Sequence, residues 1–282
     1  MLGSCGALFA QVIRSDRLTS MTIAIIGAGN MGGAVLAGLL EAGHTPDSVI
    51  VVEAREEQAA ALREKHGIRT LPATEAAAEA DVVVLAVKPY GVVPVLQSIA
   101  SALREGGTVV SLAAGVPTSA MEPAVPDGVS VVRVMPNTPA LVGEGMSVVA
   151  GGAKATPDAI TAAADLMRAV GKVVTLPESQ IDAVTAISGS GPAYVFLVAE
   201  AWIEGGVHLG LTRDDATTLV IQTLTGSAAL LESGTHPAIL REQVTSPGGT
   251  TAAALGAFEQ GGLRAAFLEA TRAAYVRSKE LS

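Results

Sequence analysis

The sequence predicts an α/β protein in which a doubly wound domain, built on a parallel sheet, is followed by an all-α domain. Three observations lead to this fold class. Short apolar stretches rich in Val and Ile alternate with helical patterns between residues 21 and 174, as in sheets covered by helices on both faces. A glycine-rich turn joins the first strand to the first helix. Over residues 175–282 the alternation stops and only helical patterns remain.

Composition restricts the classes of function. The 282 residues are enough for about two domains, and 49% hydrophobic with 16% charged residues predicts a large core. The net charge of -9 and the lack of a basic cluster argue against nucleic acid or an anionic membrane surface as a partner. The single Cys5 excludes an internal disulfide, and the four histidines show no ligand spacing, so we expect no metal site.

Residues 1–20 precede a second methionine, Met21, which leads directly into a strand. Their apolar part has no basic region before it and no clear cleavage site after it, so we expect a disordered extension rather than a signal peptide. Uncharged stretches such as residues 183–199 fall short of the roughly 20 apolar residues that a membrane span requires. We therefore expect a soluble, cytoplasmic protein.

The elements of the first domain, residues 21–174, follow from the pattern in order. A β-branched strand leads into a glycine turn and a helix that ends near Glu41. The second strand ends at Glu53 and precedes a solvated helix, which Gly67 closes. The remaining strands are predicted within 81–89, 106–115, 128–139 and 145–152, and a helix followed by a strand within 157–176.

The turn Gly27-Ala28-Gly29-Asn30-Met31-Gly32 has a G-x-G-x-x-G pattern. The pattern alone is weak evidence, but here it follows a strand, opens a helix, and precedes a second strand that ends in an acid. This context predicts a Rossmann-type dinucleotide site, in which the glycines let the backbone approach the pyrophosphate. The alternative is a glycine turn that serves packing only.

Two residues after the second strand give conflicting indications about the cofactor. The carboxylate of Glu53 suits the ribose hydroxyls of NAD and repels the 2′-phosphate of NADP, whereas Arg55 could pair with that phosphate. The prediction is therefore NADP or NAD, with no choice between them.

The pattern of the second domain, residues 175–282, predicts only helices. The stretch from Tyr194 to Trp202 is apolar nearly all round, and such a helix must be buried on every side. A domain of this size achieves that more easily by pairing with a second copy, which predicts a homodimer or higher homo-oligomer. A long helix capped by Thr212, a short helix from His236, and two closing helices complete the domain.

The segment "VTSPGGTT", residues 244–251, interrupts these helices with a turn that delivers a helix N-terminus. Unpaired backbone N–H groups and the helix dipole make such a terminus suitable for an anion. The alternative is a plain helix cap.

Five motifs occur together and in order: GAGNMG, "AVKP" (86–89), "MPNTP" (135–139), "DAVTAISGSGPAY" (182–194) and "VTSPGGTT". Over essentially the whole chain from Met21, this combination resembles pyrroline-5-carboxylate reductase. The resemblance implies NAD(P)H-dependent reduction of 1-pyrroline-5-carboxylate to L-proline, the last step of proline biosynthesis. The small residues of SGSGPA are taken as structural, because they let a long helix start close to the nucleotide domain.

The resemblance also implies site residues. The cofactor would be lined by Ile26, Gly27, Ala28, Gly29, Asn30, Met31, Gly32, Val87, Lys88 and Pro89, with Asn137 nearby. Glu53 and Arg55 are added as cofactor-binding candidates from their position after the second strand, not from the resemblance. The substrate carboxylate would be held by Ser246, Gly248, Gly249, Thr250 and Thr251. Thr251 is the candidate catalytic residue, bonding the ring nitrogen or the carboxylate. The chain departs from the family where an asparagine is frequent, at Ala73, and at Glu53-Ala54-Arg55, which replace small or basic residues.

Three other functions stay open at this point. A reductase of another cyclic imine would share these motifs. A β-hydroxyacid dehydrogenase would need a lysine on the long interdomain helix, whereas no lysine lies between Lys172 and Lys279. A non-catalytic nucleotide sensor would not need a second anion-binding loop. No His, Tyr or Lys cluster offers a general acid, so positioning and charge placement would supply most of the acceleration.

Overall fold

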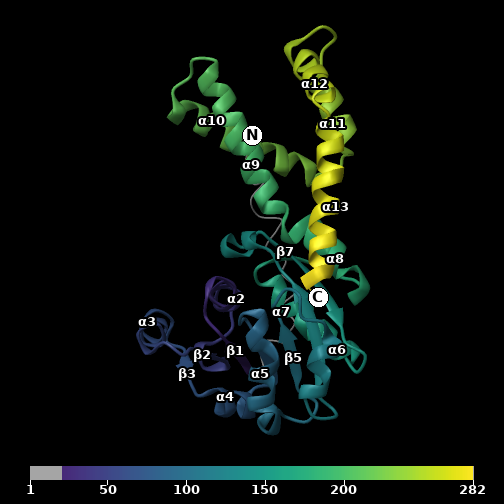
Figure 1. The fold of residues 1–282 in the computed structure, drawn as a ribbon. Helices are drawn as coiled ribbons and strands as arrows, with labels where there is room; N and C mark the ends of the chain where they lie inside the picture. The colour runs from purple at the N-terminus through teal and green to yellow at the C-terminus, as the bar shows by residue number, and fades with distance from the viewer. Residues whose placement is uncertain (1–20, 282) are drawn as a thin grey trace. The chain divides into compact units, whose positions relative to one another are not determined.

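The structure is a computed structural model that describes residues 21–281, so the expectation for residues 1–20 lies outside the described residues. It consists of two compact units (Figure 1). The first comprises the described residues up to Gly189 together with the chain end from Ser278, and the second comprises Ser190–Arg277. The strands, all in the first unit, are β1 (Ile23–Ile26), β2 (Val49–Val52), β3 (Arg69–Thr70), β4 (Val82–Leu85), β5 (Thr108–Ser111), β6 (Ser130–Met135), β7 (Gly145–Gly151) and β8 (Gly171–Thr175). Its helices are α2 (Asn30–Glu41), α3 (Glu56–His66), α4 (Ala73–Glu79), α5 (Pro89–Ile99), α6 (Thr118–Met121), α7 (Pro157–Arg168) and α8 (Ile181–Val184).

The strands form one eight-stranded sheet in the order β3-β2-β1-β4-β5-β6-β7-β8. The six strands from β3 to β6 are parallel, with Ile23 of β1 opposite Val49 of β2 and Val82 of β4. Chain order therefore reverses between β1 and β4, which is the point where doubly wound sheets bind ligands. This confirms the predicted fold class. Two strands differ from a purely parallel sheet, because β7 runs antiparallel to β6 and β8 runs parallel to β7.

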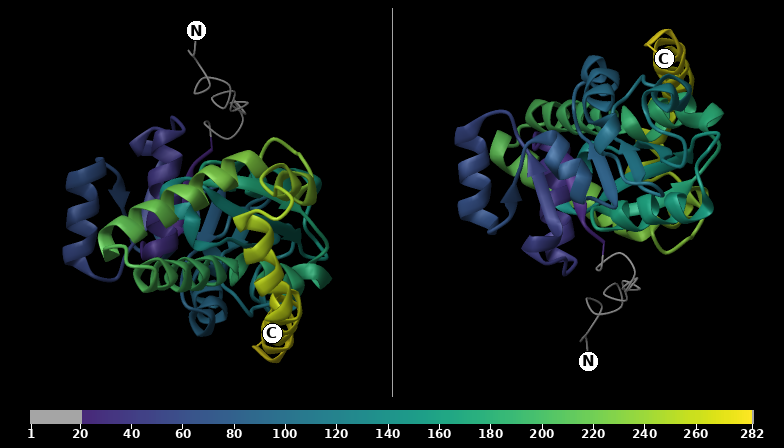
Figure 2. Two further views of the ribbon diagram at one scale, coloured as in Figure 1. Left: turned by 90° about the horizontal axis from the view of Figure 1, so that it is seen from above. Right: turned by 90° about the horizontal axis from the view of Figure 1, so that it is seen from below.

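The core lies on both faces of the sheet, which its helices enclose (Figure 2). Alternate residues of β1 point to opposite faces: Ile23 and Ile25 join one buried cluster, while Ala24 and Ile26 join the other. Helices α2 and α7 contribute to the first cluster, and α4 and α5 to the second. The continuous apolar strands in the sequence are thus strands buried on both sides.

The first unit extends beyond the change of pattern after residue 174. The segment that follows β8 packs on the sheet, because Ile181 is buried against Val148 and Ala150 of β7. Gly189 then ends a π-helical turn, and a Cβ on it would lie 2.6 Å from the Met135 Cε. A larger residue there would therefore require the Met135 side chain to move.

The second unit contains α9 (Gly191–His208), α10 (Arg213–Leu231), α11 (Pro237–Gln243), α12 (Thr250–Gln260) and α13, which runs from Leu263 to Leu281 and ends in the first unit. As predicted, Thr212 caps α10, its hydroxyl accepting from the Asp215 N–H at 3.1 Å. Helix α9 has no buried residue, and Phe196 and Leu197 are 66% and 65% exposed. A monomer leaves this apolar surface in water.

The helical run that includes α9 also corrects the expectation that the uncharged stretches of this region are too short to span a membrane. It extends over Glu178–His208, 31 residues, and is long and apolar enough to cross a membrane by length and composition alone. The same exposed surface suits pairing with another copy of the chain.

Candidate functional site

The glycine turn is shaped by close backbone contacts. Gly27 follows β1 with a φ of +94°, and a Cβ there would lie 2.9 Å from the Ala86 carbonyl oxygen. A Cβ on Gly32 would lie 1.9 Å from the Gly27 carbonyl oxygen. Both positions therefore require glycine for the turn itself, since no side chain fits there.

Gly29 differs from both neighbours, because a Cβ there would meet nothing within 4 Å in the described chain. It is the N-cap residue of α2, and no side chain caps that terminus. The first N–H groups of α2 are consequently available to an anion, and the bare Gly29 backbone lets one approach closely. These features fit the pyrophosphate of a dinucleotide.

The neighbouring strand brings the second predicted segment to the same edge of the sheet. The Ala86 N–H donates to the Ile26 carbonyl at 2.9 Å, and Val87 Cγ1 lies 3.4 Å from the Cβ position of Gly27. Lys88 is the N-cap residue of α5 and is exposed, and Pro89 begins that helix. Val87 therefore adjoins the glycine turn, and Lys88 and Pro89 follow Val87 at the start of α5. The loop Ala113–Gly115 after β5 lies at this edge too, and it was not among the predicted residues, although its position directly after a parallel strand indicates it.

Asn137 follows β6 and reaches the same edge, but both ends of its side-chain amide have partners in the chain. Its Nδ2 donates to the Ser188 carbonyl at 3.0 Å, and its Oδ1 accepts from the Met146 N–H at 2.8 Å. The side chain joins the loop after β6 to β7 and to the π-helical turn Thr185–Gly189. In this arrangement it positions the loop.

Glu53 directly follows the last residue of β2, so the strand ends one position earlier than predicted, and only 9% of the Glu53 side chain is exposed. Its Oε2 accepts from the Ala28 N–H at 3.3 Å, and its Oε1 accepts from the Arg55 N–H at 3.1 Å. Burial raises the pKa of this carboxyl, but the hydrogen bonds from Arg55 and Ala28 outweigh it and lower the pKa below its usual value. Glu53 is therefore ionised at neutral pH, and a carboxylate adjoins the glycine turn.

Gln58, in the first turn of α3, was not among the predicted residues. Its Nε2 donates to the Ala28 carbonyl at 2.7 Å, and its Oε1 accepts from Arg55 Nη2. Beyond it lies a cavity of about 470 Å³, lined by Val52, Glu53, Ala54, Glu56, Ala59, Arg63, Thr70, Leu71 and Pro72. The lining combines apolar side chains with the carboxylates of Glu53 and Glu56 and the Arg63 guanidinium, a mixture that suits the base and ribose of an adenosine.

In the second unit, residues 246–249 form a tight turn. The Gly249 N–H donates to the Ser246 carbonyl at 3.0 Å, Pro247 occupies the second position, and Gly248 has a φ of +68°. Proline followed by a glycine of positive φ is the signature of a type II turn. A Cβ on Gly249 would lie 2.4 Å from the Ser246 Oγ, so a side chain at this position would displace the Ser246 hydroxyl.

The turn delivers the N-terminus of α12 without a side-chain cap. The first N–H groups of this helix, from Thr250 onwards, have no acceptor within the helix, and the dipole favours negative charge there. Thr251 is half-buried and Thr250 exposed. The five predicted residues of the loop thus lie around one helix N-terminus that can bind an anion.

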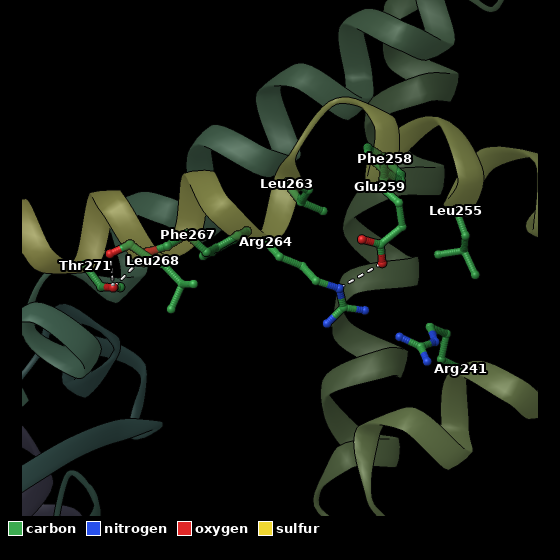
Figure 3. A pocket seen from close by; sticks show the side chains of 9 residues that line it. All are labelled: Arg241, Leu255, Phe258, Glu259, Leu263, Arg264, Phe267, Leu268 and Thr271. Atoms are coloured by element: carbon green, nitrogen blue, oxygen red, sulfur yellow. Dashed lines mark hydrogen bonds and ion pairs between the residues drawn. The ribbon is translucent and has the colours of Figure 1, made fainter.

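Apolar grooves also mark the second unit. Figure 3 shows one of about 930 Å³, where Arg264 Nε pairs with Glu259 Oε1 at 2.8 Å. It is lined by Arg241, Leu255, Phe258, Glu259, Leu263, Arg264, Phe267, Leu268 and Thr271. The groove is broad and apolar, as expected of a surface that another chain covers.

Comparisons with known proteins cover nearly the whole chain. Residues 178–281 match a family model described as pyrroline-5-carboxylate reductase dimerisation, and residues 22–115 match one described as NADP oxidoreductase, coenzyme F420-dependent. A pyrroline-5-carboxylate reductase of Corynebacterium melassecola is 46% identical over 92% of this chain and 98% of its own.

Solved structures give the same result. A pyrroline-5-carboxylate reductase of Coxiella burnetii superposes with a TM-score of 0.89 at 40% identity, covering 93% of this chain and 98% of that one. The Plasmodium falciparum pyrroline carboxylate reductase, solved with NADP bound, has a TM-score of 0.81 at 29% identity, with the same two coverages.

Proposed function

The chain belongs to the pyrroline-5-carboxylate reductase family, and from that premise we propose how its residues divide the family's reaction. The reaction is the reduction of 1-pyrroline-5-carboxylate to L-proline with NADPH or NADH, the last step of proline biosynthesis. The observation that carries the proposal is a pair of uncapped helix N-termini, each preceded by glycines. One belongs to α2 and the other to α12.

The N-terminus of α2 would hold the pyrophosphate of the dinucleotide, which the open backbone at Gly29 supports. Glu53 and Arg55 would face the adenosine ribose, and Val87, Lys88 and Pro89 would line the cofactor beside the glycine turn. Asn137 would act through the loop that it holds. When bound, the reduced nicotinamide supplies the hydride; the protein residues bind and orient it.

The N-terminus of α12 would hold the substrate carboxylate. The N–H groups of Thr250 and Thr251 and the hydroxyls of Ser246, Thr250 and Thr251 supply donors around one point of positive potential. Thr251, half-buried and the second residue of the helix, is the candidate for a hydrogen bond to the ring nitrogen or the carboxylate. Because a cyclic imine can be protonated by solvent before it binds, the chain needs to supply position and charge rather than an acid.

The remaining alternative is a substrate with a different ring. The uncapped helix terminus would recognise a carboxylate, and neither this terminus nor the glycine turn discriminates between a five-membered and a six-membered ring. An assay of NAD(P)H oxidation with the five-membered imine and its six-membered homologue, in parallel, distinguishes the two. A β-hydroxyacid dehydrogenase would need a lysine on the long interdomain helix, and α9 carries none.

The match to a dimerisation domain assigns the helical half to homo-oligomer formation. We propose that α9 is buried between copies, that the protein is cytoplasmic, and that neither nucleic acid nor a membrane is a partner. The exposed apolar surface of Glu178–His208 then faces a second chain.

Light scattering is expected to show at least a dimer at micromolar concentration. Phe196→Glu places a charge on a side chain that would be buried between copies, so we expect dissociation and loss of activity. Val142→Glu, at an exposed apolar residue of the first unit, is the control and should change neither. A stable, fully active native monomer would contradict the proposal.

NADH is expected to be used at least comparably with NADPH, because the ionised Glu53 adjoins the expected site of the 2′-phosphate. Glu53→Ser removes that repulsion, and the ratio of kcat/KM for NADPH to that for NADH should rise by about tenfold, equivalent to about 1.4 kcal/mol. Steady-state kinetics with both cofactors measures it. A native preference for NADPH of about a hundredfold would be incompatible with this role of Glu53.

A further inference from the structure

Four residues between the glycine turn and α3 form a closed ring of hydrogen bonds. The Ala28 N–H donates to Glu53, Glu53 accepts from Arg55, Arg55 donates to Gln58, and Gln58 donates back to the Ala28 carbonyl. The Gln58 amide fits in one orientation only, because its oxygen faces a guanidinium and its nitrogen faces a carbonyl.

The ring determines where the guanidinium of Arg55 is held; the other arginine beside this cavity, Arg63, is hydrogen-bonded to Glu56 and Thr70. Arg55 has a side chain that is 73% exposed, with Nε 3.4 Å from Glu53 Oε1, so this ion pair alone is a weak restraint. Gln58 is half-buried on α3 and supplies the second contact to the guanidinium. Gln58 therefore helps to keep the exposed Arg55 side chain on the Glu53 carboxylate.

We propose that Gln58 is a positioning residue that sets the choice between phosphorylated and unphosphorylated dinucleotides, acting through Arg55. The inference rests on the proposed dinucleotide site. A 2′-phosphate needs a cation, and in this arrangement Arg55 must leave both Gln58 and Glu53 to serve it. A ribose with a free 2′-hydroxyl needs an acceptor, which Glu53 supplies while the ring stays closed.

The hydrogen bond from Gln58 to the Ala28 carbonyl is expected to affect the affinity for both dinucleotides rather than the choice between them. This bond supports the glycine turn, and this turn serves both dinucleotides alike. Losing that bond weakens NADH and NADPH equally, so the ratio of their dissociation constants is insensitive to it. The ratio reports only on the contact with Arg55.

The test is a double-mutant cycle of Gln58→Leu and Arg55→Ala, read as dissociation constants of NADH and NADPH from the fluorescence of the bound dinucleotide. In the native background, Gln58→Leu should shift the ratio towards NADPH by about three- to fivefold, the scale of an exposed charged contact. In the Arg55→Ala background the same substitution should leave the ratio unchanged. An unchanged ratio in the native background, or an equal shift in both, would overturn the proposal.

These titrations contain no imine. Failure of the chain to reduce the imine would therefore contradict the proposed reaction without affecting the measured ratio of dissociation constants. A native chain that binds neither dinucleotide would overturn both. The melting temperature of each variant, measured alongside, separates loss of folding from a change in the ratio.

Discussion

Gly29→Val is expected to reduce the affinity for NADPH and NADH on the order of a hundredfold while leaving the melting temperature unchanged. The backbone at Gly29 has a φ of -68°, which valine adopts, and the space around its Cβ position is empty in the described chain. The side chain would occupy the approach of the pyrophosphate. Each lost hydrogen bond to a charged group costs about 1.5 to 3 kcal/mol.

The matched control for this substitution is Gly33→Ala, one turn along α2. A Cβ there would lie 3.6 Å from the Ala28 carbonyl oxygen, an ordinary contact. Both affinities and the melting temperature should stay near native values. If Gly29→Val binds both dinucleotides normally, the glycine turn serves packing and the cofactor lies elsewhere.

Thr251→Ala is expected to lower kcat/KM for the imine by about ten- to a hundredfold, because one hydroxyl donor to a charged group contributes about 1.5 to 3 kcal/mol. Affinity for the dinucleotide should barely change, since the other unit carries that site. Gly249→Val should reduce turnover further, because its side chain would collide with the Ser246 hydroxyl and obstruct the backbone donors.

A pure capping role for this loop predicts the opposite combination. Thr245→Ala is the control, since the Thr245 hydroxyl already donates to the Arg241 carbonyl at 2.6 Å and has a structural partner. We expect that variant to lose melting temperature and keep its kinetic constants. If Thr251→Ala behaves in the same way, with a lowered melting temperature and normal kcat/KM, the substrate carboxylate is bound elsewhere.

Local chemistry made much of this arrangement predictable. The glycine turn and the Ser246–Gly249 turn each depend on residues adjacent in sequence, so their conformations follow from glycine and proline themselves. The sheet was predictable because β1, β4 and β5 are buried on both faces and read as unbroken apolar runs.

The features that escaped prediction depend on contacts between distant segments. The antiparallel direction of β7 follows from a short link, Thr138–Val142, which leaves no room for a crossover helix. Gln58 reaches Ala28 across 30 residues, and Asn137 reaches Ser188 across 51. Such pairs are set by how α3 and the π-helical turn pack, which periodicity in the sequence does not specify.

The most direct test of the central claim is to incubate the purified chain with 1-pyrroline-5-carboxylate and NADH or NADPH, and to follow cofactor oxidation together with L-proline formed. The account predicts one proline for each dinucleotide oxidised, and loss of this turnover in Gly29→Val. Oxidation without proline, or no oxidation by a folded oligomer with either cofactor, would contradict it.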